Sequence, residues 1–383
     1  MTYFQAVVIA LIQGVTEMFP ISSLGHSVLV PAWFGGSWQT LVTQSSEASS
    51  KSSFYLAYIV ALHCATAFAL LWFFRADWVR IIRGFLRSLP ASVRLSMSAR
   101  RLRLSVRDKD ERLAWMIIFA TIPVGVAGVA LEHVFRTLFA KPAAAAVLLF
   151  VNGLILLGAE ALRRSAALRR QAGAPAAMAR PAQAGAPAGP PWEAVAPGYL
   201  AASRYPANPQ QPGHPDGAPV TPTYPSAPPG RGEHMSHRAP SGGRAAADIA
   251  EAERSDERIS RLSYKDAVVI GSAQILALLA GISRSGVTMA GGLWRGLDNE
   301  DAARFAFLLA TPVILAAGVL KVPSLAGPAG AHIHGQVAVG FIVCGIAAYV
   351  SVRFLVRWFQ TRTLIPFAIY CLAFGLLSVL RFI

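Results

Sequence analysis

The sequence predicts an all-α polytopic membrane protein that is built as an inverted-topology repeat, and three observations lead to this fold class. First, 54% of the 383 residues are hydrophobic, only 14% are charged, and the mean hydropathy is +0.46. A chain of this composition has more apolar surface than a soluble core would bury. Second, several apolar runs approach the ~20 residues that cross a bilayer. Third, the N-terminal segment recurs later in the chain.

The recurrence is an internal repeat without a gap. Nine residues, Tyr3, Ala6, Val7, Val8, Ile9, Gln13, Ile21, Ser22 and Gly25, match the residues 261 positions later, Tyr264, Ala267, Val268, Val269, Ile270, Gln274, Ile282, Ser283 and Gly286. Each copy ends in a small, hydroxyl-rich break of an apolar stretch, ISSLGH at 21–26 and ISRSGVT at 282–288.

Six spanning helices are expected, at 54–74, 114–131, 143–162, 303–320, 335–355 and 364–383. Residues 75–112 carry eleven basic and four acidic side chains, which places this segment in the cytoplasm of a bacterium. The net charge of +15 is then interpreted as a surface that faces anionic membrane lipids, and no nucleic-acid partner is expected. No cleavable signal peptide is expected, because the N-terminus lacks a basic region and Glu17 and Pro20 interrupt its first apolar run.

The two copies of the repeat are predicted to be re-entrant hairpins. Residues 264–294 begin and end on the cytoplasmic side, and two full spans would need ~40 residues, so this segment is expected to form two half-helices that meet at Gly281–Gly286. The same argument makes 1–34 a re-entrant pair that breaks at Pro20–Gly25. Each half then contains one hairpin and three spans, an odd count, which inverts one half relative to the other.

Three regions follow from this organisation. Residues 1–162 form the first membrane half and 263–383 the second. Residues 163–262 are predicted to be a disordered cytoplasmic linker rich in Pro, Ala and Gly, because sixteen of the 25 prolines lie within 171–240. The segment 35–53 is expected to be a polar periplasmic loop.

Charged side chains in the apolar breaks indicate a functional site. A charge at membrane depth costs at least ~2.5 kcal/mol, so Glu17, His26 and Arg284 are expected to face one another, water or a ligand. A structural Glu–Arg pair that joins the hairpins is the simplest alternative. The other polar and small residues of the breaks favour a ligand site, and they are Ser22, Ser23 and Gly25 in the first break and Ser283, Ser285, Gly286 and Thr288 in the second.

These residue types suit an anion of the phosphate kind. Half-helices that start after Pro20 and Gly281 would direct backbone N–H groups and positive dipole ends at the site, and an arginine can bind two phosphate oxygens with its planar fork. A site that only bound phosphate would need little more. Glu17, Ser23 and His26 add a base, a nucleophile and an acid, which favours turnover.

At these residues the chain resembles the undecaprenyl-diphosphatases, membrane enzymes linked to bacitracin resistance. The family's first motif, E/Q-G-x-T-E-F-x-P-x-S-S-x-G-H, corresponds to QGVTEMFPISSLGH at 13–26. The second, P-G-x-S-R-S-G-x-T, corresponds to AGISRSGVT at 280–288. The flanking spans are similar through FLLATP at 307–312 and IPFAIY at 365–370, so the resemblance covers nearly the whole chain except the linker and 35–53.

The resemblance implies that undecaprenyl diphosphate is cleaved to the monophosphate carrier and inorganic phosphate. The implied catalytic residues are Glu17, Ser23, His26 and Arg284, and the implied substrate-binding residues are Ser22, Gly25, Ser283, Ser285, Gly286 and Thr288. Ser23 would attack the terminal phosphorus while His26 moves protons, or a water activated by Glu17 would attack instead. Glu17 would hold the divalent cation, Mg²⁺ or Ca²⁺, that the family needs, or would orient His26.

This sequence departs from the family pattern at several places. Gln13 stands where some members carry a second glutamate, so a mechanism that needs two carboxylates there is in doubt. Ala280 replaces a proline and Met18 an aromatic residue, and neither change removes a reacting group. In the next span many members carry a glutamine-leucine-glycine stretch, and this chain has Leu62, His63 and Cys64. For His63 both a packing role and a role in proton handling are open.

A second functional class follows from the predicted architecture. Inverted repeats with broken helices also occur in transporters, so a flippase that moves a polyprenyl phosphate without hydrolysis is the main alternative, and a non-catalytic binder is the third. The site is expected to open to the periplasm of the inner membrane. Besides the lipid substrate and membrane lipids, a homo-oligomer is compatible with the sequence.

Overall fold

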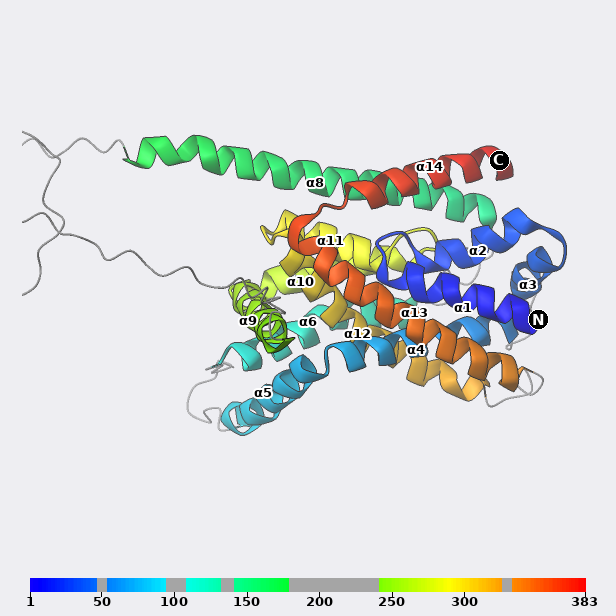
Figure 1. The fold of residues 1–383 in the computed structure, drawn as a ribbon, viewed down its shortest axis with the longest axis horizontal. Helices are drawn as coiled ribbons and strands as arrows, with labels where there is room; N and C mark the ends of the chain where they lie inside the picture. The colour runs from blue at the N-terminus through cyan, green and yellow to red at the C-terminus, as the bar shows by residue number, and fades with distance from the viewer. Residues whose placement is uncertain (47–53, 94–107, 132–140, 179–240, 326–332) are drawn as a thin grey trace, which may run out of the picture. The chain divides into compact units, whose positions relative to one another are not determined.

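All regular secondary structure within the described residues is helical. The computed structural model describes residues 1–46, 54–93, 108–131, 141–178, 241–325 and 333–383. Their elements, in chain order, are α1 (Tyr3–Met18), α2 (Ser23–Phe34), α3 (Gly36–Ser46), α4 (Phe54–Phe73), α5 (Arg75–Val93), α6 (Lys109–Ala130), α8 (Pro142–Met178), α9 (Ser241–Ser260), α10 (Tyr264–Ser272), the 3₁₀ helix η1 (Ala273–Leu278), α11 (Arg284–Trp294), α12 (Asn299–Leu325), α13 (His334–Thr361) and α14 (Ile365–Phe382) (Figure 1).

The apolar helices confirm a multi-pass membrane protein. Within the described ranges, five helices are long and apolar enough to cross a membrane: α6, α8 over Pro142–Arg169, α12 over Asn299–Gly318, α13 and α14. A sixth candidate is α4, which passes the same test of length and composition together with α5, from which it is bent by 83°. Together with α4, these five helices correspond to the six runs predicted from the sequence.

The two copies of the sequence repeat form similar broken helix pairs. The first pair consists of α1 and α2, and the second of α10, η1 and α11. Thr2 caps α1 and Ser263 caps α10, and both caps are completed by the side chain three residues later, Gln5 and Asp266. These four positions are again related by 261 residues, so the repeat extends to the hydrogen bonds that start the two helices.

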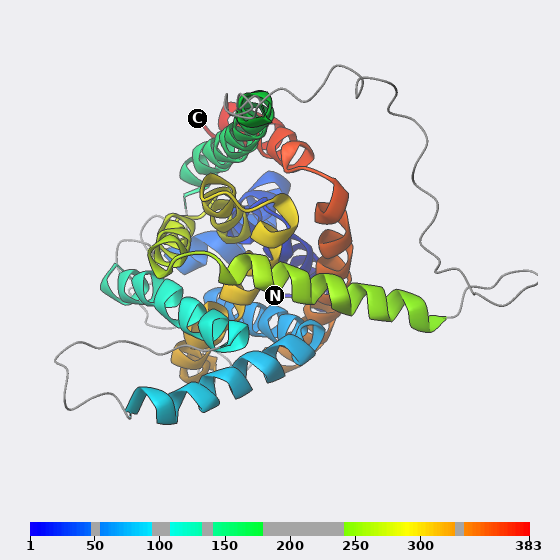
Figure 2. The same ribbon diagram turned by 90° about the vertical axis from the view of Figure 1, so that its left-hand side faces the viewer.

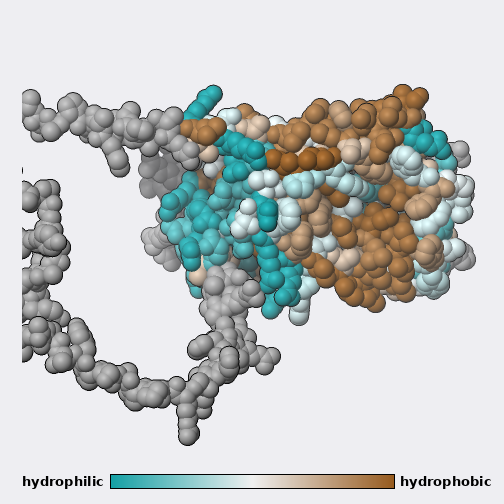
Figure 3. Space-filling view, turned by 45° about the horizontal axis from the view of Figure 1, so that its top comes forward, coloured by the Kyte–Doolittle hydropathy of each residue, from teal (hydrophilic) through white to brown (hydrophobic). Residues whose placement is uncertain are grey.

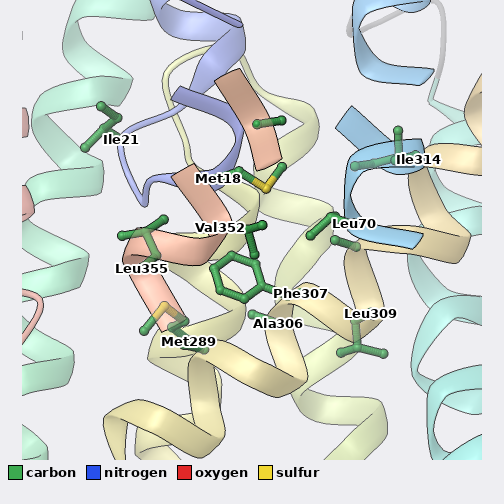
Figure 4. Packing of buried hydrophobic residues seen from close by; sticks show 14 of the residues in the cluster. Met18, Ile21, Leu70, Met289, Ala306, Phe307, Leu309, Ile314, Val352 and Leu355 are labelled. Carbon is green, nitrogen blue, oxygen red and sulfur yellow. The ribbon is translucent and has the colours of Figure 1, made fainter. Parts of the chain in front are cut away.

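Each broken pair packs against a long helix of the other half of the chain. Helix α1 contacts α13, and α10 contacts α6. Both contacts are close, because a Cβ atom added to Gly14 would lie 2.5 Å from the carbonyl oxygen of Cys344, and one added to Gly271 would overlap the backbone of Ala120. Helix α4 packs on both α12 and α13. In this core, Phe307 of α12 is surrounded by side chains that include Val352 of α13 and Leu70 of α4 (Figure 4).

The outer surface of the helices is divided by polarity. Figure 3 shows hydrophobic residues over most of the visible face and hydrophilic residues gathered at the left, the end where α9 lies in Figure 1. Large apolar side chains such as Val350 of α13 and Leu380 of α14 are exposed. Many large apolar side chains are exposed in this way, as expected of a surface that contacts lipid. The hydrophilic end is as expected of a segment at the membrane surface.

Three segments that were expected to lack regular structure contain helix. Helix α3 lies within the predicted loop 35–53, α8 continues past residue 162 to Met178, and α9 occupies the end of the predicted linker. Helix α9 is held by ion pairs that sequence patterns do not reveal: Asp256 is buried and accepts hydrogen bonds from Arg80 of α5 and Arg304 of α12. The proline-rich stretch between these helices lies outside the described residues, so the expectation of disorder there stays a prediction.

Candidate active site

The carboxylate of Glu17 lies at the centre of the cluster formed by the two helix breaks. It is 6% exposed and sits in the last turn of α1. Its Oε2 atom accepts a hydrogen bond of 2.5 Å from the hydroxyl of Ser23, the first residue of α2. Its Oε1 atom accepts a bond of 2.9 Å from Nη2 of Arg284, the first residue of α11. Three of the four predicted catalytic residues therefore meet directly, although Arg284 is 267 positions from Glu17 in the sequence.

Two further side chains contact the same carboxylate. Gln13 Nε2 donates to Glu17 Oε2 at 3.0 Å, and His63 Nε2 of α4 lies 3.3 Å from this oxygen. The other ring nitrogen of His63, Nδ1, is 2.8 Å from the carbonyl oxygen of Ile59 and must donate to it, because a carbonyl only accepts. His63 Nε2 then either accepts from Gln13 Nε2, 3.2 Å away, or carries a second proton toward Glu17. In both states, Glu17 is surrounded by donors and by positive charge.

His26 is placed differently from the sequence expectation. Its Nδ1 atom donates to the carbonyl oxygen of Ser22 at 2.7 Å, and its Nε2 atom lies 2.7 Å from the hydroxyl of Tyr370 in α14. The imidazole ring stacks against the rings of Tyr370 and Phe374. Among the described residues it forms no hydrogen bond with Ser23 or Glu17. The structure thus brings His26 to Tyr370 in α14 and not to the Glu17–Ser23 pair.

Ser22 and Ser283 cap the two helices that start at the breaks. Ser22 Oγ accepts from the N–H of Gly25, and Ser283 Oγ accepts from the N–H of Gly286, both at 3.2 Å. Ser22 has a φ of 68°, which is costly for a residue with a side chain, and its Oγ also accepts from the N–H of Gly281 at 3.2 Å. These two serines, expected to bind substrate, thus hold the breaks in shape and bind them to each other.

The predicted glycine positions explain how closely the breaks approach. Gly281 has a φ of 114°, and a Cβ atom there would lie 2.6 Å from the carbonyl oxygen of Ala145. A Cβ atom on Gly25 would lie 3.0 Å from the Cα of Gly281. Glycine is therefore required at the point where the two breaks meet. At Gly286, whose φ is not positive, a Cβ atom would be 3.1 Å from the side chain of Ser283, a fit about as close as that at Gly25.

The remaining predicted residues lie in the first turn of α11 or just after it. Ser285 Oγ is 3.1 Å from Ser283 Oγ and 3.3 Å from the carbonyl oxygen of Phe19, so it also joins the second break to the first. Thr288 is fully buried and donates to the carbonyl oxygen of Arg284. Arg284 itself retains an unused donor, because its buried Nη1 atom has no hydrogen-bond partner among the described residues.

Asn152 of α8 connects the two breaks from a third helix. Its Oδ1 atom accepts from the N–H of Ser283 at 3.0 Å, and its Nδ2 atom donates to the carbonyl oxygen of Pro20 at 3.0 Å and to Cys371 Sγ at 3.4 Å. The residue is completely buried. One amide thus satisfies a backbone donor of the second break and a backbone acceptor of the first.

Sequence patterns did not indicate Asn152 as a site residue, and they left the role of His63 open. Both were visible as isolated polar residues in apolar spans, at positions where polarity is costly. The sequence does not show that α4 and α8 pack next to the breaks, so neither residue could be assigned to the site.

Comparison with known proteins identifies the family. The sequence model of the family described as "Bacitracin resistance protein BacA" matches residues 6–183 and 243–377. The chain belongs to the BacA family. Curated relatives match over the full length: "Undecaprenyl-diphosphatase 2" from Frankia alni is 53% identical over 100% of this chain and 98% of its own length. "Undecaprenyl-diphosphatase 1" from Frankia casuarinae is 46% identical over 100% and 98%, and "Undecaprenyl-diphosphatase" from Mycolicibacterium paratuberculosis is 45% identical over 98% and 95%.

Both breaks lie inside the part of the chain that matches the BacA family. The family match leaves out residues 184–242, which contain most of the proline-rich stretch. The resemblance stated from the two motifs is confirmed by these matches.

Proposed function

We propose that this BacA-family chain hydrolyses undecaprenyl diphosphate to undecaprenyl phosphate and inorganic phosphate at the two helix breaks. The names of its full-length relatives support the reaction. The observation that carries the proposed site is the 2.5 Å hydrogen bond from Ser23 Oγ to Glu17 Oε2, next to a buried arginine with one unused nitrogen. A hydroxyl, its base and a phosphate-binding group are then in contact at one place in the membrane.

Ser23 is the proposed nucleophile and Glu17 its base. As Ser23 Oγ attacks the terminal phosphorus, its proton passes to Glu17 Oε2, and the bond to the bridging oxygen breaks to release undecaprenyl phosphate. Water then hydrolyses the phosphoserine, and the proton held by Glu17 leaves with the products. The rival route uses Glu17 to activate a water for direct attack. In both routes the base is Glu17, and His26 supports the position of α2 through its contacts with Tyr370.

Arg284 and the helix N-termini would bind the transferred phosphoryl group. Nη2 of Arg284 is held by Glu17, which leaves the buried Nη1 for a phosphate oxygen. Helices α2 and α11 both begin at the breaks, so their positive dipole ends converge on the same place. This arrangement stabilises the charge on the equatorial oxygens as the bond to the leaving group breaks.

The residues present do not fit a resident Mg²⁺ or Ca²⁺ ion. Such ions take carboxylate and carbonyl oxygens, and Glu17 is the single carboxylate among the described residues of the breaks. Both of its oxygens already accept hydrogen bonds, and Arg284 lies 2.9 Å away. No group of three or more His, Cys, Asp or Glu residues within the described part of the chain could hold a metal ion. The proposed steps therefore use only side chains, backbone groups and water.

The contacts support an inverted repeat whose site lies within the membrane. The pairing of α1 with α13 matches the pairing of α10 with α6 when the two halves are exchanged. In Figure 1, α1 begins at the right, beside the N-terminus, and α10 begins at the left, beside α9, so the two pairs enter from opposite ends. With the basic segment 75–112 in the cytoplasm, the first hairpin starts on the periplasmic side of the inner membrane, and the site opens to the periplasm.

The test is phosphate release from undecaprenyl diphosphate by the purified protein in detergent. Replacing Ser23 by Ala is expected to lower kcat by about 10²–10⁴-fold, and Glu17→Gln by a similar factor. With radioactive terminal phosphate and an acid quench, label should remain on the unsubstituted protein and be absent from Ser23→Ala. Full activity of Ser23→Ala would refute the covalent route and leave the water route.

A flippase is the second candidate, favoured by the entry of the two hairpins from opposite ends. Detergent removes the two compartments that transport needs, so release of phosphate there distinguishes the candidates. If folded protein releases none, the hydrolase proposal fails, and Glu17 and Arg284 become a pair that holds the hairpins together.

A further inference from the structure

Helix α5 has an exposed face that no other described element covers. Helix α5 follows α4 in the chain, and the two helix axes are bent by 83° relative to each other. Val79, Ile82 and Leu86 are 45%, 50% and 56% exposed. They are spaced by three and four residues, which places them on one side of the helix. Arg83 and Arg87 adjoin them and are also exposed.

The opposite face of α5 is firmly packed, so the exposed face has a fixed direction. Ser88 is buried and accepts a hydrogen bond of 3.0 Å from Trp115 Nε1 of α6, and Phe85 lies against the ring of Trp115. Gly84 allows close contact, because a Cβ atom there would be 2.8 Å from the backbone of Asp110. The helix cannot turn to hide its apolar side chains without breaking this packing.

The charges of α5 show that it does not continue the span of α4. Arg80 binds Asp77 and Asp256 and is thereby neutralised at the polar end of the protein. Arg83 and Arg87, by contrast, form no ion pair with any residue that the structure describes. Arginines of this kind are costly at membrane depth. Figure 2 shows α5 lengthwise along the lower edge of the bundle, as expected of a helix that runs across the direction of the spans.

We propose that α5 lies in the plane of the membrane and binds anionic lipid headgroups, with Val79, Ile82 and Leu86 at the acyl boundary and Arg83 and Arg87 against lipid phosphates. Interfacial helices combine apolar side chains with basic ones in this way, and the long arginine stems let the charges reach the headgroups. Trp72, 65% exposed at the end of α4, stacks with Arg75 at 5.3 Å and marks the same level. The basic excess of this segment assigns it to the cytoplasmic leaflet. This proposal is independent of the reaction at the helix breaks.

The experiment measures the depth of α5 in the full-length protein. An environment-sensitive fluorophore is attached to Ile82→Cys, to Leu86→Cys and, as a matched control, to Glu257→Cys on the neighbouring α9, whose side chain is 58% exposed. The unsubstituted protein, with its three cysteines, supplies the background. The variants are reconstituted into phosphatidylcholine vesicles, with or without phosphatidylglycerol, that contain a lipid with a shallow nitroxide quencher. Gel filtration and Tm confirm that each variant is folded.

Quenching at positions 82 and 86 is expected to exceed that at 257 by at least about twofold, because the apolar face of an interfacial helix is buried ~5–10 Å into the headgroup boundary. Phosphatidylglycerol should increase it further, and the double substitution R83Q/R87Q should abolish that increase. Equal quenching at all three positions would overturn the proposal. A second outcome would also overturn it: no quenching at positions 82 and 86, together with cross-linking between two copies through Leu86→Cys. This result would assign the exposed face of α5 to a second copy of the chain.

Discussion

Replacing Asn152 by Leu tests whether a third helix holds the two breaks in register. Leucine has the same branching as asparagine and is not smaller, so the substitution removes the amide without leaving a cavity. It leaves the buried N–H of Ser283 without its partner, and it leaves the carbonyl oxygen of Pro20 with only the weak 3.9 Å hydrogen bond from Cys371 Sγ. An unpaired buried group costs about 1–3 kcal/mol and the weakened one adds to it, so the variant should be less stable by about 1–6 kcal/mol.

The same substitution should lower activity beyond its effect on stability. Ser283 precedes Arg284, so a shift of this backbone moves the guanidinium relative to Glu17. A displacement near 1 Å at a reacting group can cost ~10²-fold in rate. The expected outcome is a lower Tm in detergent and a kcat reduced by about 10–100-fold per folded molecule, with a smaller change in KM.

Two further variants make this experiment specific. Thr311→Val in α12 is the control, because it removes a buried hydroxyl that donates only to Phe307 of its own helix, and it should keep kcat near the unsubstituted value. Asn152→Asp keeps the acceptor for Ser283 but loses the donor to Pro20, and should be impaired as well. If Asn152→Leu retains both its Tm and its kcat within about twofold, a factor worth less than ~0.5 kcal/mol, the bridging role is wrong.

Three other substitutions test separate features of the site. Arg284→Lys keeps the positive charge but removes the guanidinium, which binds Glu17 through Nη2 while its Nη1 atom has no partner among the described residues. The value of kcat/KM for phosphate release should therefore fall by about 10–100-fold, which corresponds to one charge-assisted hydrogen bond. An unchanged kcat/KM would show that the second guanidinium nitrogen is not used. Gly281→Ala forces a side chain onto a φ of 114° and against a neighbouring helix, and should lower Tm by an amount equivalent to about 1–3 kcal/mol. Gly128→Ala, where a Cβ atom meets nothing within 4 Å, is its control, and equal Tm values for the two would contradict the strain. Gln13→Glu adds a second carboxylate beside Glu17 and should create a site for Mn²⁺ that electron paramagnetic resonance detects. If the unsubstituted protein binds Mn²⁺ comparably, the conclusion that its residues do not fit a resident cation is wrong.

Local patterns predicted the membrane spans and the two helix breaks. Apolar runs predicted the spans, and serine or threonine at the starts of the repeat copies corresponds to helix caps in the structure. The 261-residue repeat predicted both helix breaks to within a few residues. The helices α3 and α9 were missed, because their polar sequences lack the apolar periodicity on which such predictions depend, and α9 is held by buried charges from distant segments.

The sequence by itself determined a membrane protein with two polar helix breaks, and it showed which residue types lie there. Costly polar groups in an apolar chain can be recognised without coordinates. Only the tertiary structure decided which groups meet: Ser23 contacts Glu17, His26 turns to Tyr370, and His63 and Asn152 join the site from other helices. Hydrogen bonds act over about 3 Å, and the positions of residues along a chain do not specify such distances between helices. Those distances depend on how α4, α8 and α14 pack around the two breaks.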